Sequence, residues 1–331
     1  MDDKLQELIF KANKVYNENF NNETYFGRCI FLSWYCDKGS CDFCFRSTIK
    51  HKIKHSKNAK RSVASILTDA YLGKKLGFKI EFLTGGYGIF EFDEIVDITK
   101  KVSEIYNEKI WINLGVLSKE EMIKLKPYIK GICASIETIE EELHNKICPE
   151  KPIKPYEEML DIANSLKLKK SITIVIGLNE KKEDINLLFD FIKKHKLDQI
   201  TFYALKPIKE TPYTKSPSIE YYSWWIANTR INFPKLKIIA GLTPKTPEYT
   251  KIILKAGANA ITKFPVLKKF NTKDTKLIED QIKEANRNMT SNLTKLPKFD
   301  IDKDLEKFDF NTELKKNMKE KIMQYINKFE K

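Results

Sequence analysis

The sequence has no long apolar run and no secretory signal. Among its 331 residues, no stretch of hydrophobic side chains approaches the roughly 18 residues that a membrane-spanning helix needs. The first residues, MDDKLQE, lack the basic and then apolar order that directs secretion. We therefore expect a cytoplasmic protein without a membrane partner.

Arginine is scarce although the chain is strongly basic. The formal net charge is +14, yet only five of the 59 basic residues are arginine. Proteins that read nucleic acids rely on arginine for phosphate and base contacts, and no RRM, KH or zinc-knuckle signature is present. Nucleic acid is therefore not expected as a partner, whereas a small anionic substrate agrees with the charge.

Strand and helix patterns alternate along the chain. Hydrophobic residues make up 42% of it, enough for one large α/β barrel or two smaller domains. Strands are predicted over residues 28–35, 79–83, 110–114, 131–136, 171–176, 199–205, 236–240 and 258–264. Helices are predicted after them over residues 62–77, 93–106, 118–128, 155–166, 182–195, 219–231, 246–257 and 274–288.

Eight strand–helix units predict a parallel sheet closed into a complete (β/α)8 TIM barrel, an α/β fold. Helix signals agree with the predicted boundaries. Ser118 and Glu121 form the pattern of a capping box, and Gly77 and Gly257 stand where helices end.

The barrel is predicted to have an extension at each end. Residues 1–27 form an N-terminal helical cap with a helix over residues 3–19, and residues 28–291 form the barrel. Residues 292–331 form a C-terminal loop and a helix over residues 313–329. Packing on the barrel, dimerisation and partial mobility all stay open as roles for this last segment.

Three cysteines stand in a loop after the first predicted strand. Cys36, Cys41 and Cys44 are separated by four and then two residues. Thiolates suit zinc, copper(I) or iron–sulfur clusters, and three thiolates on a four-iron cluster leave one iron open for a substrate or cofactor. A structural zinc site completed by a distant Cys or His is the alternative, although no second Cys pair or His-x3-5-His follows. The other cysteines are expected to be buried packing residues: Cys29, Cys133 and Cys148.

Other predicted strands also end in residues suited to binding. Gly85 and Gly86 allow a ligand or backbone to come close. Ser135 and Glu137 share one strand face, where the carboxylate can accept hydrogen bonds from ribose hydroxyls or an ammonium group. A surface carboxylate is the alternative for Glu137. The fifth predicted strand ends in the apolar residue Ile176 followed by a glycine, where a flat adenine ring has room to lie.

Together these motifs resemble the radical S-adenosylmethionine enzymes. The resemblance rests on the cysteines with Phe43 before Cys44, the paired glycines, the sequence Ser-x-Glu-Thr from residue 135 and Gly-Leu-x-Glu from residue 177. Within that superfamily the chain is most similar to the biotin synthase-like group. Its segments look most like the methanogen branch linked to biosynthesis of the iron-guanylylpyridinol (FeGP) cofactor of [Fe]-hydrogenase. The likeness runs over residues 5–288.

The chain also departs from the family pattern. Three residues usually separate the first two cysteines of the motif, whereas four separate Cys36 from Cys41 in this chain. A longer first gap is typical of the methanogen branch. Tyr87 stands where many members have a glutamate. Cys133 has no partners for the auxiliary cluster of biotin synthase, so sulfur insertion is not expected.

The resemblance implies a site and a chemistry. Cys36, Cys41 and Cys44 would hold a 4Fe-4S cluster whose fourth iron binds S-adenosylmethionine, and a ferredoxin or flavodoxin type of reductant would supply the electron for a 5′-deoxyadenosyl radical. The implied cofactor-binding residues are Phe43, Thr84, Gly85, Gly86, Ser135, Glu137, Ile176 and Tyr203. Lys206, Arg230 and Lys263 are candidates for binding a small anionic substrate, and a charge at the surface or the barrel end is the alternative for each.

Three functions are consistent with the sequence. The first is biosynthesis of the pyridinol part of the FeGP cofactor by a radical enzyme. The second is another biotin synthase-like radical enzyme with a different small substrate. The third, of a different class, is a zinc-bearing RNA-binding protein.

Overall fold

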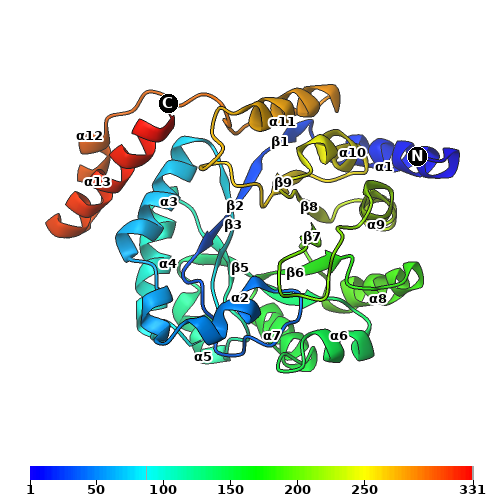
Figure 1. Cartoon of the computed structure of the whole chain (residues 1–331), viewed down its shortest axis with the longest axis horizontal. Coiled ribbons are helices and arrows are strands. Elements are labelled where there is room, and N and C mark those ends of the chain that lie inside the picture. The colour runs from blue at the N-terminus through cyan, green and yellow to red at the C-terminus, as the bar shows by residue number, and fades with distance from the viewer. Residues whose placement is uncertain (87, 330–331) are drawn as a thin grey trace.

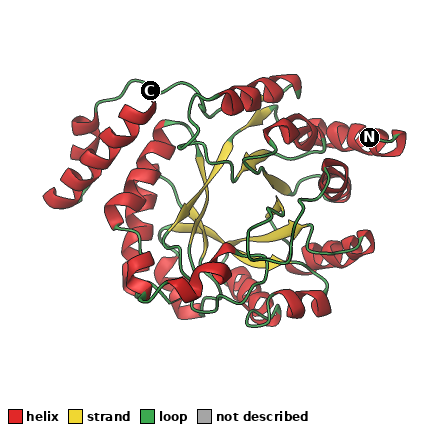
Figure 2. Cartoon of the chain, in the orientation of Figure 1, coloured by secondary structure: helices red, strands yellow, loops and turns green. Residues whose placement is uncertain are grey.

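The computed structural model describes residues 1–86 and 88–329. Eight parallel strands close into a barrel in their chain order, and helices surround it (Figures 1 and 2). The α/β barrel prediction is therefore confirmed. The barrel strands are β2 (Phe26–Phe31), β3 (Lys79–Thr84), β4 (Ile110–Asn113), β5 (Ile129–Glu137), β6 (Lys169–Ile176), β7 (Gln199–Ala204), β8 (Lys237–Gly241) and β9 (Ala260–Thr262).

All the predicted helices are present, and each begins and ends within four residues of its expected bounds. The helices are α1 (Asp3–Asn19), α2 (Phe45–Ile49), α3 (Val63–Lys75), α4 (Phe92–Tyr106), α5 (Lys119–Leu125), α6 (Glu141–Ile147), α7 (Lys154–Ser165), α8 (Ile185–His195), α9 (Ile219–Asn232), α10 (Thr250–Lys255), α11 (Lys273–Glu284), α12 (Ile301–Glu306) and α13 (Thr312–Phe329). Short 3₁₀ turns cover Lys50–Lys52, Ser56–Ala59, Lys182–Asp184 and Pro247–Tyr249.

The helix signals in the sequence correspond to real caps. Ser118 accepts a hydrogen bond from the N–H of Glu121, whose side chain bonds back to the Ser118 N–H. Gly77 and Gly257 follow α3 and α10 with φ of 73° and 104°. That left-handed conformation is favourable for glycine and ends both helices.

The first barrel strand is shorter at its end than predicted. A strand was expected over residues 28–35, but β2 stops at Phe31. The chain then leaves the barrel because Ser33 pairs with Lys60 in an isolated antiparallel bridge. Cys36 consequently lies in a separate loop beside the barrel mouth rather than immediately after the strand.

The two ends of the chain pack on the outside of the barrel. α1 lies against α9 and α10, and α13 lies beside α3 (Figure 1). Asp304 of the C-terminal segment binds Lys75 at 2.5 Å and accepts a hydrogen bond from Tyr71, both on α3. Of the roles left open for this segment, packing on the barrel is the one that the structure shows.

The sequence did not predict a small second sheet. β1 (Glu23–Thr24) pairs in parallel with β10 (Asn288–Met289), which joins the chain before the barrel to the chain after it. Two-residue strands carry no periodic pattern, so sequence reasoning has nothing to detect. No helix among the described residues is long and apolar enough to cross a membrane.

Candidate active site at the mouth of the barrel

A cavity of about 450 Å³ opens where the barrel strands end. In (β/α)8 barrels this carboxyl-terminal face carries the catalytic residues. Most of the residues singled out from the sequence meet there. The predicted residues that line the cavity are Cys36, Cys41, Phe43, Cys44, Thr84, Gly85, Gly86, Ser135, Glu137, Tyr203, Lys206 and Lys263.

Ile176 does not face this cavity. Side chains alternate along β6, so that Thr173 and Val175 line the cavity while Ile174 and Ile176 pack in the main hydrophobic core. The prediction that Ile176 stacks on an adenine is therefore wrong. Val175 is the apolar residue of this strand that a bound ring would meet.

Arg230 also lies away from the cavity. It is fully buried on α9, where its guanidinium donates to the main-chain oxygens of Gly257 at 3.0 Å and Leu236 at 2.8 Å. It also donates to Asn259 Oδ1 at 2.6 Å. These bonds tie α9 to the segments that precede β8 and β9, so the predicted contact with substrate is wrong.

The three cysteines reach the cavity from the loop between β2 and α2. Their thiols are free and half-buried. The N–H of Cys44 donates to the Cys41 oxygen at 3.1 Å, which makes a tight turn. The N–H of Asp42 donates to the oxygen of Ile147 at 3.1 Å, which fastens the loop to the end of α6.

Cysteine thiolates hold two kinds of metal site that need different arrangements. Within residues 1–86 and 88–329, no three Cys, His, Asp or Glu side chains converge as ligands of one metal ion. A zinc ion needs such convergence, since its sulfur ligands lie about 2.3 Å away. In a four-iron cluster each cysteine binds a different iron, so the sulfurs stand farther apart. Three free thiols around one cavity would leave one iron of such a cluster open.

A fourth cysteine lies behind the loop. Cys148 is fully buried, packs against Cys41 and does not line the cavity. A hydrogen bond with Cys148 holds the pKa of Cys41 below its usual range, while burial raises the pKa of Cys44. The expected burial of Cys29 and Cys133 is confirmed as well.

The paired glycines pack directly on the cysteine loop. A Cβ on Gly86 would lie 1.7 Å from the oxygen of Tyr35 and 2.8 Å from the Cα of Cys36. A Cβ on Gly85 would meet its nearest atom, in Leu32, at 3.4 Å. Gly86 is therefore needed for the close approach of two backbones. Tyr87, where a glutamate is usual in the family, lies outside the described residues.

Two polar pairs stand at the ends of β4 and β5. Ser135 Oγ donates to Asn113 Oδ1 at 2.8 Å, and Lys151 Nζ lies 2.7 Å from Glu137 Oε1. Burial alone would lower the pKa of Lys151, but the charge of Glu137 raises it well above its ordinary value. Glu137 has φ of 65°, an uncommon value for a residue other than glycine.

Sequence reasoning missed both partners in these pairs. Asn113 is the polar end of the apolar strand Ile110–Asn113, a signal that was available. Lys151 carries no local signal because it comes from the loop after α6 and meets Glu137 only in the fold.

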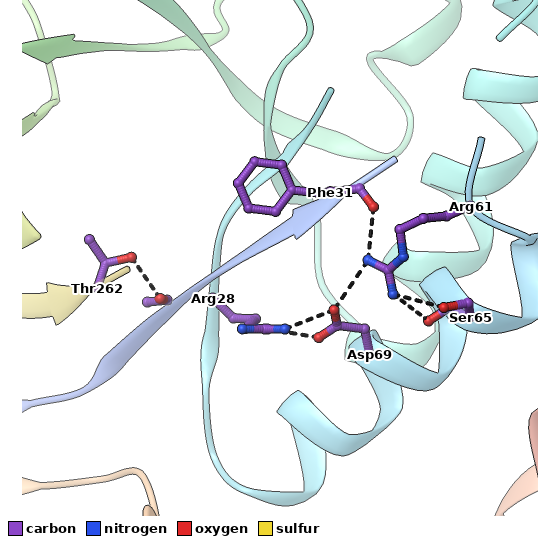
Figure 3. A network of polar contacts seen from close by, with 7 residues as sticks. Arg28, Phe31, Arg61, Ser65, Asp69 and Thr262 are labelled. Carbon is purple, nitrogen blue, oxygen red and sulfur yellow. Dashed lines mark hydrogen bonds and ion pairs between the residues drawn. The ribbon is translucent and has the colours of Figure 1, made fainter. Parts of the chain in front are cut away.

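A buried ion network holds the end of β2, where the cysteine loop begins. Arg61 donates to the main-chain oxygens of Phe31 at 2.8 Å and Ser65 at 2.9 Å (Figure 3). Its guanidinium also lies 3.3 Å from Asp69, which accepts two further hydrogen bonds from Arg28 at 2.7 and 2.9 Å. The carboxylate of Asp69 thus joins α3 to β2 and to the segment after the cysteines.

Comparisons with known proteins agree with this geometry. The model of the family described as "Radical SAM superfamily" matches residues 33–192. The protein MJ0597 of Methanocaldococcus jannaschii is 37% identical over 98% of this chain and 96% of its own length. The biotin synthase of Clostridium tetani is 27% identical over 78% of this chain and 81% of its own length.

A solved structure has the same fold. The crystal structure of methylornithine synthase (PylB) superimposes with a TM-score of 0.69 at 22% identity, covering 79% of this chain and 78% of that one. The segment that matches the family model contains the cysteine loop and the strands β3 to β6, which line most of the cavity. We conclude that this chain belongs to the radical S-adenosylmethionine superfamily, with biotin synthase-like homologues, and is a radical enzyme.

Proposed function

We propose that this enzyme cleaves S-adenosylmethionine reductively in the cavity at the barrel mouth, and that it acts in biosynthesis of the pyridinol part of the FeGP cofactor. The observation that carries the first part is the grouping of Cys36, Cys41 and Cys44 around that cavity in a chain of this superfamily. When bound there and reduced, a 4Fe-4S cluster would supply the electron that converts S-adenosylmethionine to methionine and a 5′-deoxyadenosyl radical.

The three cysteines would hold the cluster and leave one iron open toward the cavity. Cys148 packs against Cys41, is fully buried and does not line the cavity, so we do not assign it to the open position. The role of the loop is to present three thiolates and to keep the fourth position for the cofactor.

The remaining cavity residues would orient S-adenosylmethionine. Thr84 and the main chain at Gly85 and Gly86 are placed beside the cysteine loop, where the methionine amino group would bind. Ser135 with Asn113, and Glu137 with Lys151, offer polar atoms to the ribose or the methionine carboxylate. The adenine would lie against Phe43 and Val175, which supply apolar surface and exclude water.

The pathway is supported by sequence likeness alone. Residues 135–138, 148–149, 177–180, 201–212 and 256–265 resemble the methanogen branch, and the four-residue cysteine gap follows that branch's tendency. Another biotin synthase-like reaction on a different small substrate is the alternative. The zinc-bearing RNA-binding protein is no longer a candidate, because the chain is a radical enzyme of this superfamily.

The proposed chemistry is tested with protein purified without oxygen. We expect about four irons per chain, and 5′-deoxyadenosine on addition of dithionite and S-adenosylmethionine. A colourless protein with one zinc and no 5′-deoxyadenosine would contradict the proposal. The pathway is tested separately by deleting the gene in a host that makes FeGP. Unchanged amounts of the cofactor would contradict the pathway and leave the radical chemistry standing.

Gly86→Ala should displace the cysteine loop. Its Cβ would overlap the main chain of Tyr35 and Cys36, and backbone cannot move aside as a flexible side chain can. We expect the reconstituted variant to hold less than about half the iron of the parent, because overpacking typically costs about 1–3 kcal/mol and acts on the loop itself. The matched control is Gly85→Ala, whose Cβ would meet no atom closer than Leu32 Cβ at 3.4 Å and should keep the iron content. Equal iron in both variants would contradict this account of the loop.

A further inference from the structure

Among residues 1–86 and 88–329, four cationic side chains line the cavity but only one carboxylate does. The carboxylate, Glu137, is already paired with Lys151. Among the described residues, no ion pair joins the other three cations, Arg46, Lys206 and Lys263, to an acidic group. The residues that line the cavity therefore carry a net positive charge.

Arg46 also lies over two aromatic rings, but of these three cations Lys263 is the one with a left-handed backbone. It follows β9 with φ of 68°, a strained conformation for a residue other than glycine. Its Nζ lies over two aromatic rings, 5.0 Å from the centre of Phe31 and 4.6 Å from the centre of Tyr203. Cation–π contacts of this kind orient an ammonium group without neutralising its charge.

A buried carboxylate fixes the groups around Lys263. Glu81 of β3 is 1% exposed and lies beneath the cavity lining. It accepts hydrogen bonds from the Tyr203 hydroxyl at 2.6 Å, from the Cys29 thiol at 2.9 Å and from the Thr262 hydroxyl. These three donors occupy both of its oxygens. The position of Lys263 is thereby fixed at both ends. Tyr203 lies under its ammonium group, and Thr262 precedes it in the main chain.

We infer that Lys263 binds an anionic oxygen group, a carboxylate or a phosphate, of the substrate on which the radical acts. This inference rests on the proposed function and names its substrate class. Arg46 is not part of the subsite, because it follows Cys44 by two residues and its guanidinium already donates to the oxygen of Ser33 at 3.2 Å. Lys206 and Lys263 are both exposed, but among the described residues no aromatic ring lies under the Lys206 ammonium group, so Lys206 contributes only to the general field of the cavity.

Simple aromatic anions test the subsite. Benzoate and phenyl phosphate are titrated, each against neutral benzamide, into the full-length reconstituted enzyme with S-adenosylmethionine. We expect one or both anions to bind at least about tenfold more tightly than benzamide, as hydrogen bonds to charged groups typically contribute. Lys263→Gln should abolish that preference and Lys263→Arg should retain it. The better of the two anions identifies the group that the subsite takes.

Lys206→Gln is the matched control, since it removes the same charge from the same cavity and should keep the preference. An equal affinity for anions and benzamide in the parent, a preference that survives in Lys263→Gln, or an equal loss in Lys206→Gln would overturn the assignment. Formation of 5′-deoxyadenosine without any added substrate is measured in parallel. Its absence in the parent counts against the proposed function, whereas its presence without an anion preference counts against the subsite alone.

Discussion

Cys41→Ala is expected to abolish 5′-deoxyadenosine formation. The variant has only two of the three thiolates that line the cavity, and a cluster held by two sulfurs is not retained at a fixed place beside the cofactor. We expect the rate to fall at least about a thousandfold, or about 4 kcal/mol in activation free energy. The rate is measured under dithionite with S-adenosylmethionine, together with the iron content of the protein.

Cys148→Ala is the control for this prediction. Cys148 packs against Cys41 but is fully buried and does not line the cavity, so its removal should leave the iron content unchanged and should change the rate by less than about threefold. An equally large loss in both variants would mean that four protein sulfurs hold the metal. No iron would then be open to S-adenosylmethionine, and the proposed chemistry would have no site.

Asp69→Ala is expected to have the largest effect on stability. The Asp69 side chain is 5% exposed and binds the guanidinium groups of Arg28 and Arg61. Its removal leaves two poorly solvated cations side by side, and breaking a buried ion pair from one side costs about 3–5 kcal/mol. The free energy of unfolding is measured by urea denaturation of the anaerobic protein.

An exposed ion pair provides the comparison. Asp280 lies 3.2 Å from Lys283, with both side chains largely in solvent. Asp280→Ala should therefore change the free energy of unfolding by less than about 1 kcal/mol. If the two variants were equally stable, the network at the end of β2 would not be what holds that strand and the loop after it.

The sequence contained enough information for the barrel and for most of the cavity lining. Each βα unit is a local pattern, and residues at the ends of parallel strands meet at one face whatever the details of packing. That is why Gly86, Ser135 and Lys263, far apart in the chain, could be assigned to one site. The C-terminal segment could not be placed, because its contact with α3 depends on packing between distant parts of the chain.

The predictions for Ile176 and Arg230 were wrong for different physical reasons. For Ile176 the signal was present, since Thr173 is a polar residue within the apolar part of the strand and marks the face that alternates toward the cavity. For Arg230 no local signal exists, because its partners Gly257 and Asn259 are 27 and 29 residues away in sequence. The role of the buried Glu81 could not be predicted from the sequence either, because its hydrogen-bond partners belong to three other strands.

The central claim is that three thiolates leave one iron open to S-adenosylmethionine in the cavity. Electron–nuclear double resonance on the reduced enzyme tests it most directly, with S-adenosylmethionine labelled with isotopes at its amino and carboxylate groups. The account predicts that the labels couple magnetically to the cluster in the parent. A cluster spectrum that is the same with and without the labelled cofactor would contradict it.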